Sequence, residues 1–422
     1  MSNYQLVSMK KSARSFRLVC SPDQVSDVEA LLYAEGFAFI AEPFFHLART
    51  LITEPFPLGR SLAARFGYIY IQDKSSMLPP LALAPPKGAV VLDLCASPGS
   101  KTGILSHLVG PTGLVLANEP SPDRLATLRQ NMRHLGCFNV VTCRYEAQHL
   151  PLPPHTWPFI LLDAPCSGWG TIEKNPQAAQ IWSGEKTAPL EALQRELLAQ
   201  AARLLAPGGH VLYSTCTTNM RENEDQIRYA LDFLGLEIVP LSPFAGFTFA
   251  PSLPGCLLVD GRDSSAQGFF LACLTRPGSG KLVKYDTTVL PGTLLGAQEF
   301  STRTGLNTSW LPEHEFLCAS GHMYLILNQA KQVLPQGLHW QGLRIGKEAK
   351  GALLPDLTLR SFIPIEPTDQ DLILSEPQDM HKLLAGQSWP YSGPAKRRAL
   401  YYKNLPLGYL TVKGKRCLWS DR

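Results

Sequence analysis

The stretch AVVLDLCASPGSKT, residues 89–102, decides the fold. It begins with an apolar run, as expected for a strand that is buried on both faces of a parallel sheet. Pro98 and Gly99 then form a tight loop, and a helix is predicted to start near Ser100. Amides at such a helix N-terminus can bind a carboxylate or phosphate, and glycine lets a ligand approach closely. The stretch matches neither GxGxxG nor GxxxxGK[ST], so neither the dinucleotide nor the P-loop fingerprint is present.

Further strands and helices follow this stretch in regular alternation. After the strand at 89–94, the predicted strands are LVLANE (114–119), VVTCRY (140–145), FILLDA (159–164) and HVLYST (210–215). Because helical patterns separate them, the sequence predicts the α/β class with an open, doubly wound, Rossmann-like sheet.

Two of the intervening helices have clear end signals. One is predicted over 123–135, with an acid at its start and Gly136 as its stop. The other is predicted over 188–205 and is ended by the Pro-Gly-Gly sequence at 207–209.

The flanking segments lack this alternation. The N-terminal part contains one helical stretch at 26–37, and short strand-like pieces such as GHMYLIL (321–327) follow a Pro/Gly/Ser linker at 276–280. We therefore expect a small α+β module at residues 1–75 and an α/β central domain at 76–278. Two mainly β modules should follow, at 285–360 and 361–422, of which the second is basic.

Composition excludes several classes of protein. The chain has 422 residues with a net charge of +4, and it contains no apolar run long enough to span a membrane and no secretory signal. These features favour a cytoplasmic protein without a membrane partner, and we expect a monomer. Its ten cysteines include no CxxC pair, and no HxxxH completes a zinc site, so we expect thiols rather than disulfides and no bound metal.

Charge is concentrated at the C-terminal end. Residues 381–422 carry nine Lys or Arg against one acid. The same stretch contains six aromatic residues, namely Trp389, Tyr391, Tyr401, Tyr402, Tyr409 and Trp419. Cations attract phosphates and aromatic faces stack on unpaired bases, so an RNA-binding module is one interpretation. A solvated basic surface over a small aromatic core is the other.

Two motifs place thiols at neighbouring strand ends. ILLDAPCSGWGT (160–171) ends a strand in Asp163 and continues to Cys166, and HVLYSTCTTNMRENED (210–225) ends the next strand before Cys216. Ligands of open α/β sheets bind at the carboxyl ends of the strands. The sequence therefore predicts a site that contains both thiols.

These motifs resemble those of the Nol/Nop/Sun family of RNA cytosine-5 methyltransferases. The resemblance rests on DLCASPGSKT, DAPCSGWGT and YSTCTTNMRENE and on the preceding QDKSSMLPPLAL, and it covers about residues 70–275. The flanking parts resemble the branch that methylates bacterial small-subunit ribosomal RNA and ends in a PUA-like module. The resemblance implies a Rossmann-like S-adenosylmethionine-dependent methyltransferase domain, with 16S ribosomal RNA as the favoured substrate.

The resemblance also implies roles for individual residues. Cys216 corresponds to the nucleophile and Cys166 to a second cysteine that helps release the base, while Asp163 lies beside both cytosine and cofactor. Glu119 would contact the ribose of S-adenosylmethionine, and Glu146 its adenine. The methionine moiety would be held by Cys95, Ala96, Ser97, Pro98, Gly99, Ser100 and Lys101.

The sequence departs from the family pattern at four positions. Ser97 and Ser100 stand where the family often has alanine and glycine, and Glu146 stands where it usually has aspartate. Glu173 occupies a position that is often basic, which removes one expected RNA contact.

Three alternatives are considered beside ribosomal RNA methylation. A DNA cytosine-5 methyltransferase would use the Pro-Cys thiol as its nucleophile and would not need Cys216, so the presence of Cys216 argues against that class. Transfer RNA is the main rival substrate. A catalytically silent RNA-binding or ribosome assembly factor is the alternative of another class, and the retained pair of thiols argues against it.

Overall fold

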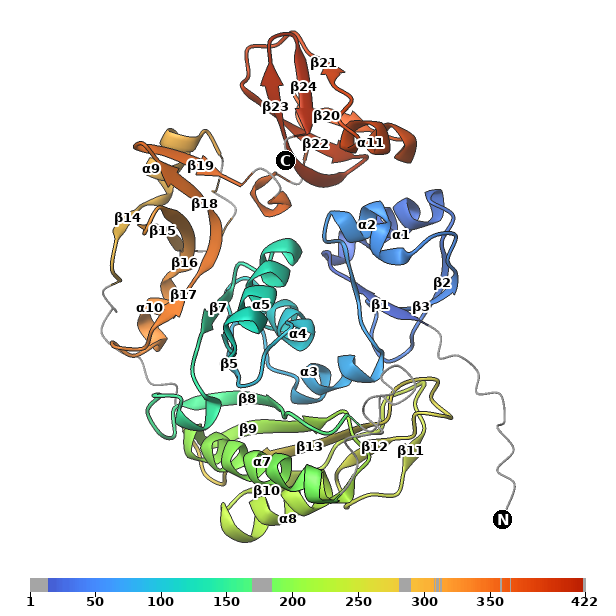
Figure 1. Cartoon of the computed structure of the whole chain (residues 1–422), viewed down its shortest axis with the longest axis vertical. Coiled ribbons are helices and arrows are strands. Elements are labelled where there is room, and N and C mark those ends of the chain that lie inside the picture. Colours follow the sequence, from blue (N-terminus) through green and yellow to red (C-terminus); the bar gives the residue numbers. More distant parts are fainter. Residues whose placement is uncertain are drawn as a thin grey trace.

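The computed structural model describes residues 14–168, 184–280 and 290–419, apart from positions 307, 309, 310, 312, 357, 358 and 365. The described chain forms four sheets, of which the largest lies at the centre of the sequence (Figure 1). Among the described residues, no helix combines the length and the apolar character needed to cross a bilayer.

The central sheet has the order β11-β12-β13-β9-β8-β5-β6-β7-β17, with β10 also paired to β13. Its parallel strands are β5 (Val90–Asp93), β6 (Leu114–Asn118), β7 (Val140–Cys143), β8 (Trp157–Asp163) and β9 (Leu205–Thr215). The antiparallel strands are β10 (Glu237–Val239), β11 (Phe249–Ala250), β12 (Leu257–Val259), β13 (Phe269–Thr275) and β17 (Trp340–Gln341). The predicted α/β class and the five predicted parallel strands are confirmed.

Helices cover both faces of this sheet because successive residues of each strand point to opposite sides. Val91 belongs to the core under α4 (Ser100–Val109) and α5 (Pro122–Leu135), to which α3 (Leu78–Leu83) also contributes. Leu92 belongs to the opposite core, under α7 (Gly184–Leu204) and α8 (Glu224–Phe233). Figure 1 shows these two helical layers on either side of the strands.

The N-terminal module is a four-stranded antiparallel sheet with the order β2-β3-β1-β4. Its elements are β1 (Ser15–Leu18), α1 (Val25–Ala34), β2 (Ala38–Ala41), β3 (Ala48–Thr53), α2 (Leu62–Arg65) and β4 (Ile69–Ile71). The predicted helix at 26–37 ends early, because Gly36 has φ +87° and cannot continue a right-handed helix.

Two modules, each built mainly of one β-sheet, follow the central domain. The first contains β14 (Thr293–Leu295), β15 (His314–Ala319), β16 (His322–Leu327), β18 (Leu343–Ala349) and β19 (Ala352–Pro355), with helices α9 (Ala297–Thr304) and α10 (Asn328–Val333). The second contains β20 (Leu372–Leu374), β21 (Trp389–Pro390), β22 (Arg397–Tyr402), β23 (Leu405–Lys413) and β24 (Arg416–Trp419), with helix α11 (Pro377–Leu384). The predicted strand at 321–327 is β16.

The last sheet packs on the N-terminal module although the two lie at opposite ends of the chain (Figure 1). The rings of Trp419 and Phe66 pack edge to face, with their centroids 5.5 Å apart. The Tyr68 hydroxyl donates to the Pro406 carbonyl at 2.7 Å. Arg360 lies 3.9 Å from the centre of the Tyr68 ring and donates to the carbonyl of Gly67. Both modules therefore share one hydrophobic core.

This shared core corrects the interpretation of the C-terminal aromatic residues as a stacking surface. Tyr401, Tyr402 and Trp419 are buried, and the half-buried Tyr409 donates its hydroxyl to the Phe362 carbonyl. These rings are therefore used in packing, and the basic residues beside them form the accessible part of the module.

The helix preceding β9 also differs from the prediction. It starts at Gly184 rather than at 188, and it ends at Leu204, before the predicted Pro-Gly-Gly stop. Residues 207–209 lie inside β9, where Leu205 pairs with Trp157 but His210 pairs with Phe159. The extra residues of β9 bulge out, and Gly208, at φ +74°, allows this conformation.

We expect Trp419→Ala to lower the free energy of unfolding by about 3–5 kcal/mol, because it empties a large volume in the shared core. Urea denaturation followed by circular dichroism measures this change. Ile373→Ala in the same module is the control, since Ile373 is 48% exposed, and it should change stability by less than about 0.5 kcal/mol. Equal stabilities of the two variants would contradict a shared core.

Candidate active site

The candidate site lies where β8 and β9 end side by side. These strands pair in parallel, with Asp163 opposite Ser214, so the loops that follow both strands leave from the same edge. The first loop carries Cys166 and the second begins at Cys216. Their sulfur atoms are 3.0 Å apart, and the Cys216 amide donates to the Cys166 sulfur at 3.3 Å. The structure thus brings together the two thiols that the sequence singled out.

The environments of the two thiols favour opposite protonation states. A hydrogen bond from Cys166 lowers the pKa of Cys216. Burial and the charge of Asp163 act to raise this pKa, whereas the nearby charge of Lys101 acts to lower it, and the net shift is downward. The pKa of Cys166 is raised well above its usual value by this same hydrogen bond, by burial and by the charge of its partner. Of the two thiols, Cys216 is therefore the one that ionises more readily.

Lys101 and Asp163 form an ion pair beside the thiols. The Lys101 ammonium donates to Asp163 Oδ2 at 2.7 Å and to the Ser76 hydroxyl at 3.1 Å, while Ser214 donates to Asp163 Oδ1 at 2.8 Å. Burial alone would lower the pKa of Lys101, but the Asp163 carboxylate outweighs it and the pKa is raised. Lys101 therefore holds a permanent positive charge next to Cys216.

The loop from Cys95 to Lys101 connects β5 to α4, as predicted. Gly99 precedes the helix with φ +102°, and a Cβ atom at this position would lie 2.6 Å from the Met132 side chain. The left-handed backbone conformation therefore favours glycine here, and any other residue would also require the Met132 side chain to shift. The Thr102 hydroxyl, in the first turn of α4, donates to Asp93 at 2.7 Å. The other residues predicted for this loop are Ala96, Ser97, Pro98 and Ser100, of which Pro98 is the most exposed.

Two acidic residues follow the neighbouring strands along the same edge of the sheet. Glu119 follows β6 and is 1% exposed, and its carboxylate accepts from the Ser121 amide at 3.0 Å. Glu146 follows β7 and is exposed to solvent. Glu173 and the other residues at 169–183 lie outside the described residues.

Sequence reasoning missed the polar network behind the two thiols. Glu222, which is fully buried, accepts hydrogen bonds from the loop after β8 and from Gln194 of α7. The only sequence signal was its place in the polar run after Cys216, which carries no information about long-range partners.

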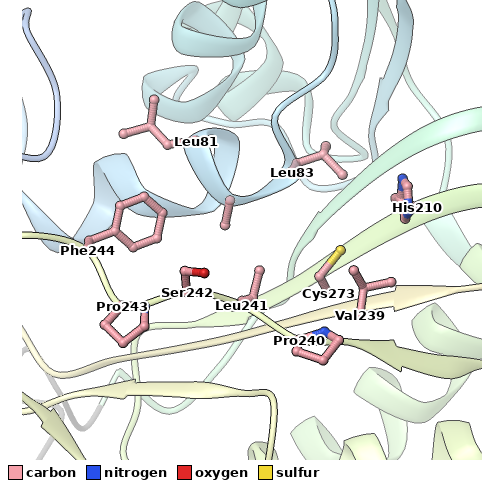
Figure 2. A pocket seen from close by; sticks show the side chains of 11 residues that line it. Leu81, Leu83, His210, Val239, Pro240, Leu241, Ser242, Pro243, Phe244 and Cys273 are labelled. Atoms are coloured by element: carbon pink, nitrogen blue, oxygen red, sulfur yellow. The ribbon is translucent and has the colours of Figure 1, made fainter.

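A pocket of about 360 Å³ lies elsewhere, between α3 and the segment at 239–244 (Figure 2). Its lining is mostly apolar and includes Leu83, Cys273 and His210. Burial lowers the pKa of His210, which pairs with Thr275 near the start of β9. Because Cys216 follows the other end of that strand, this pocket does not belong to the candidate site.

Several known proteins are similar to this chain in sequence. Residues 80–274 match the family described as 16S rRNA methyltransferase RsmB/F. The chain is 34% identical over 303 residues to the ribosomal RNA small subunit methyltransferase F of Salmonella paratyphi A, which covers 69% of this chain. The chain spans 62% of the length of that relative.

Solved structures share the fold. A methyltransferase homolog protein from Pyrococcus horikoshii is 32% identical, with a TM-score of 0.56, and the match covers 63% of this chain and 87% of that one. NSun6 from the same organism, solved with SFG, is 20% identical, with a TM-score of 0.58. This match covers 64% of the present chain and 92% of the NSun6 chain. The central domain therefore has the fold of the S-adenosylmethionine-dependent methyltransferases.

We expect iodoacetamide at pH 7 to alkylate Cys216 before the other cysteines, because the pKa of Cys216 is lowered. Burial instead raises the pKa of Cys20 to about 11 and the pKa of Cys256 to about 12. Peptide mass spectrometry gives the rate at each thiol. Cys166→Ala removes the donor to Cys216, so alkylation of Cys216 should slow and its pH midpoint should rise. An unchanged midpoint in this variant would show that the Cys166 thiol does not stabilise the Cys216 thiolate.

Proposed function

Because this chain belongs to the 16S rRNA methyltransferase RsmB/F family, we propose that it methylates carbon 5 of cytosine in RNA through a covalent adduct on Cys216. The favoured substrate is 16S ribosomal RNA. The single observation that carries the cytosine-5 chemistry is the pair of thiols in contact, with the pKa of Cys216 lowered and that of Cys166 raised.

The residues at the ends of β5 and β6 fit S-adenosylmethionine. Amides at the start of α4 suit the carboxylate of its methionine moiety, and Gly99 leaves room for close approach. The buried Glu119 carboxylate, oriented by the Ser121 amide, suits the ribose hydroxyls. We assign the exposed Glu146 to the adenine. When bound, S-adenosylmethionine supplies a methyl group on a positively charged sulfur.

Cys216 makes carbon 5 of cytosine reactive. This carbon is too weak a nucleophile to take a methyl group directly. The Cys216 thiolate adds to carbon 6, and the electron pair of the ring double bond moves to carbon 5. S-adenosylmethionine, held by residues 95–101, would supply the methyl group there, its sulfur keeping the electron pair of the broken sulfur–methyl bond. Asp163, held by Lys101 and Ser214, can hydrogen-bond the polar edge of the base and stabilise the adduct.

Release of the product reverses the addition. A base removes the proton from carbon 5, the double bond re-forms, and the bond from carbon 6 to the Cys216 sulfur breaks. Cys166 is the nearest thiol to that sulfur, at 3.0 Å. We assign it to this step, in which a proton donor beside the departing sulfur favours elimination.

The DNA methyltransferase alternative differs from this proposal in which thiol attacks. A DNA cytosine-5 methyltransferase would use the Pro-Cys thiol, Cys166, yet here the pKa of Cys166 is raised. A catalytically silent assembly factor would have no use for the ion pair of Lys101 and Asp163 beside a thiolate. Transfer RNA remains the rival substrate, and the following experiment separates it from ribosomal RNA.

We expect Cys166→Ala to accumulate a covalent complex with small-subunit ribosomal RNA that survives denaturing electrophoresis, because addition proceeds and elimination is impaired. Cys216→Ala should form neither complex nor product, as judged by bisulfite sequencing of the RNA. Cys256→Ala, at a half-buried thiol outside the site, is the matched control and should behave as the unaltered protein.

Two outcomes would change these assignments. Methylation by Cys216→Ala would remove that residue from the role of nucleophile. A complex formed with transfer RNA and not with ribosomal RNA would identify transfer RNA as the substrate and leave the roles of the thiols intact.

We propose that the N-terminal module, residues 1–75, and the basic module, residues 361–422, contact RNA and help offset the cost of unstacking the target base, roughly a few kcal/mol. In the basic module, Lys413 and Lys415 are exposed at the turn between β23 and β24. They are free to approach phosphates because both side chains are exposed.

Replacing Lys413 and Lys415 by alanine should weaken RNA binding and reduce the slope of log affinity against log salt concentration by about one for each phosphate that is no longer bound. Fluorescence anisotropy over a series of salt concentrations measures both quantities. Lys350→Ala, at an exposed turn of the preceding sheet, is the control for a general loss of charge. The same slope in all three proteins would exclude this turn from the RNA interface.

A further inference from the structure

Glu222 is a fully buried carboxylate between the two cysteine loops. Its Oε1 atom accepts from the Ser167 amide at 2.9 Å and from the Gln194 side chain at 3.1 Å. Its Oε2 atom accepts from the Ser167 hydroxyl at 2.6 Å and from the Asn219 side chain at 3.2 Å. Four donors from three residues thus converge on one side chain.

These donors belong to elements that are distant in sequence. Ser167 directly follows Cys166 in the loop after β8, whereas Glu222 itself lies in the short 3-10 helix Met220–Glu222 that follows the Cys216 loop. Gln194, on α7, also donates to the carbonyl of Pro165, at 2.8 Å. Glu222 therefore connects both cysteine loops to each other and to the helix that covers them.

We propose that Glu222 is a positioning residue that fixes the loop of Cys166 against the loop of Cys216 and so holds the two sulfur atoms in contact. Calling the two thiols catalytic rests on the proposed function. The geometric proposal does not, because it concerns only the distance between two side chains.

The loops need such a connection because neither has regular structure. Residues 164–168 and 216–219 belong to no helix or strand, so no backbone ladder fixes their separation. Among the described residues, other links between them are the contact of Ser167 with Thr217, at 3.1 Å between hydroxyl oxygens, the contact between the two sulfur atoms, and the bond from the Cys216 amide to the Cys166 sulfur at 3.3 Å. A small displacement is enough to break a hydrogen bond to sulfur, so the distance must be set by stronger bonds.

Only a carboxylate matches this set of donors. All four partner groups donate, and a carboxylate offers two acceptor oxygens and no donor. Glutamine would place an NH2 group against the amide of Asn219 or against the donors of Oε1. The loops would then separate at one of these points, and the thiols with them.

The test measures the reactivity of Cys216 in the full-length protein without RNA. For Glu222→Gln, we expect the pH midpoint of iodoacetamide alkylation at Cys216 to rise by about one unit, which slows alkylation at pH 7 by about tenfold. Cys166→Ala, which removes the thiol donor itself, gives the largest shift that separating the two sulfur atoms can produce.

Glu224→Gln is the matched control. Glu224 is also a buried carboxylate, two positions away, but it accepts from Ser252 at 2.6 Å and begins α8. We expect it to leave the alkylation profile of Cys216 unchanged. Thermal denaturation of both variants shows whether reduced stability alone explains a shift, because a general reduction in stability would affect both profiles alike.

Ser167→Ala keeps the test decisive if Glu222→Gln fails to fold. It removes the hydroxyl that bridges Glu222 and Thr217 but keeps the backbone bond to Glu222, so it should move the midpoint in the same direction by a smaller amount. An unaltered profile in folded Glu222→Gln, or in Ser167→Ala when the other variant is unfolded, overturns the proposal. Failure to form an RNA adduct would instead refute the proposed function and leave the alkylation result standing.

Discussion

The parallel pairing of β8 with β9 is the constraint on which the site depends. Asp163 and Ser214 lie opposite each other in this pair, and each strand continues into a loop with a cysteine. Because both loops start from the same edge, a few residues are enough to bring the two sulfur atoms to 3.0 Å. A shift of the register by one residue would turn Asp163 to the other face of the sheet and away from Lys101.

Charge then distinguishes two chemically identical side chains. Lys101, from the first turn of α4, donates to Asp163 and lies close enough to Cys216 for its charge to lower the pKa of that thiol. Cys166 instead faces the charge of its partner, which favours its protonated form. The same sheet edge therefore carries two thiols with opposite pKa shifts, and the position of one lysine contributes to this difference.

The sequence was sufficient where the relevant interactions are local or periodic. Apolar runs predicted the five parallel strands, and the positions of Cys166 and Cys216 after two of them predicted that the thiols meet. The bulge at 207–209 was missed because Pro-Gly-Gly usually separates elements, and only pairing with β8 keeps it within a strand. Glu222 was missed because its partners, such as Gln194, come from distant elements that no local pattern relates.

The packing of the terminal modules likewise could not be predicted from local sequence, and it restrains the basic module relative to the thiols. Basic and aromatic residues near the C-terminus suggested an exposed stacking surface, but the burial of Tyr402 and Trp419 depends on a sheet from the other end of the chain. That N-terminal sheet continues directly into Ser76, whose hydroxyl accepts from Lys101. A continuous path of packed elements thus leads from the basic module to the thiols. RNA held by that module would therefore be presented to Cys216 from a fixed direction, and not by a freely tethered arm.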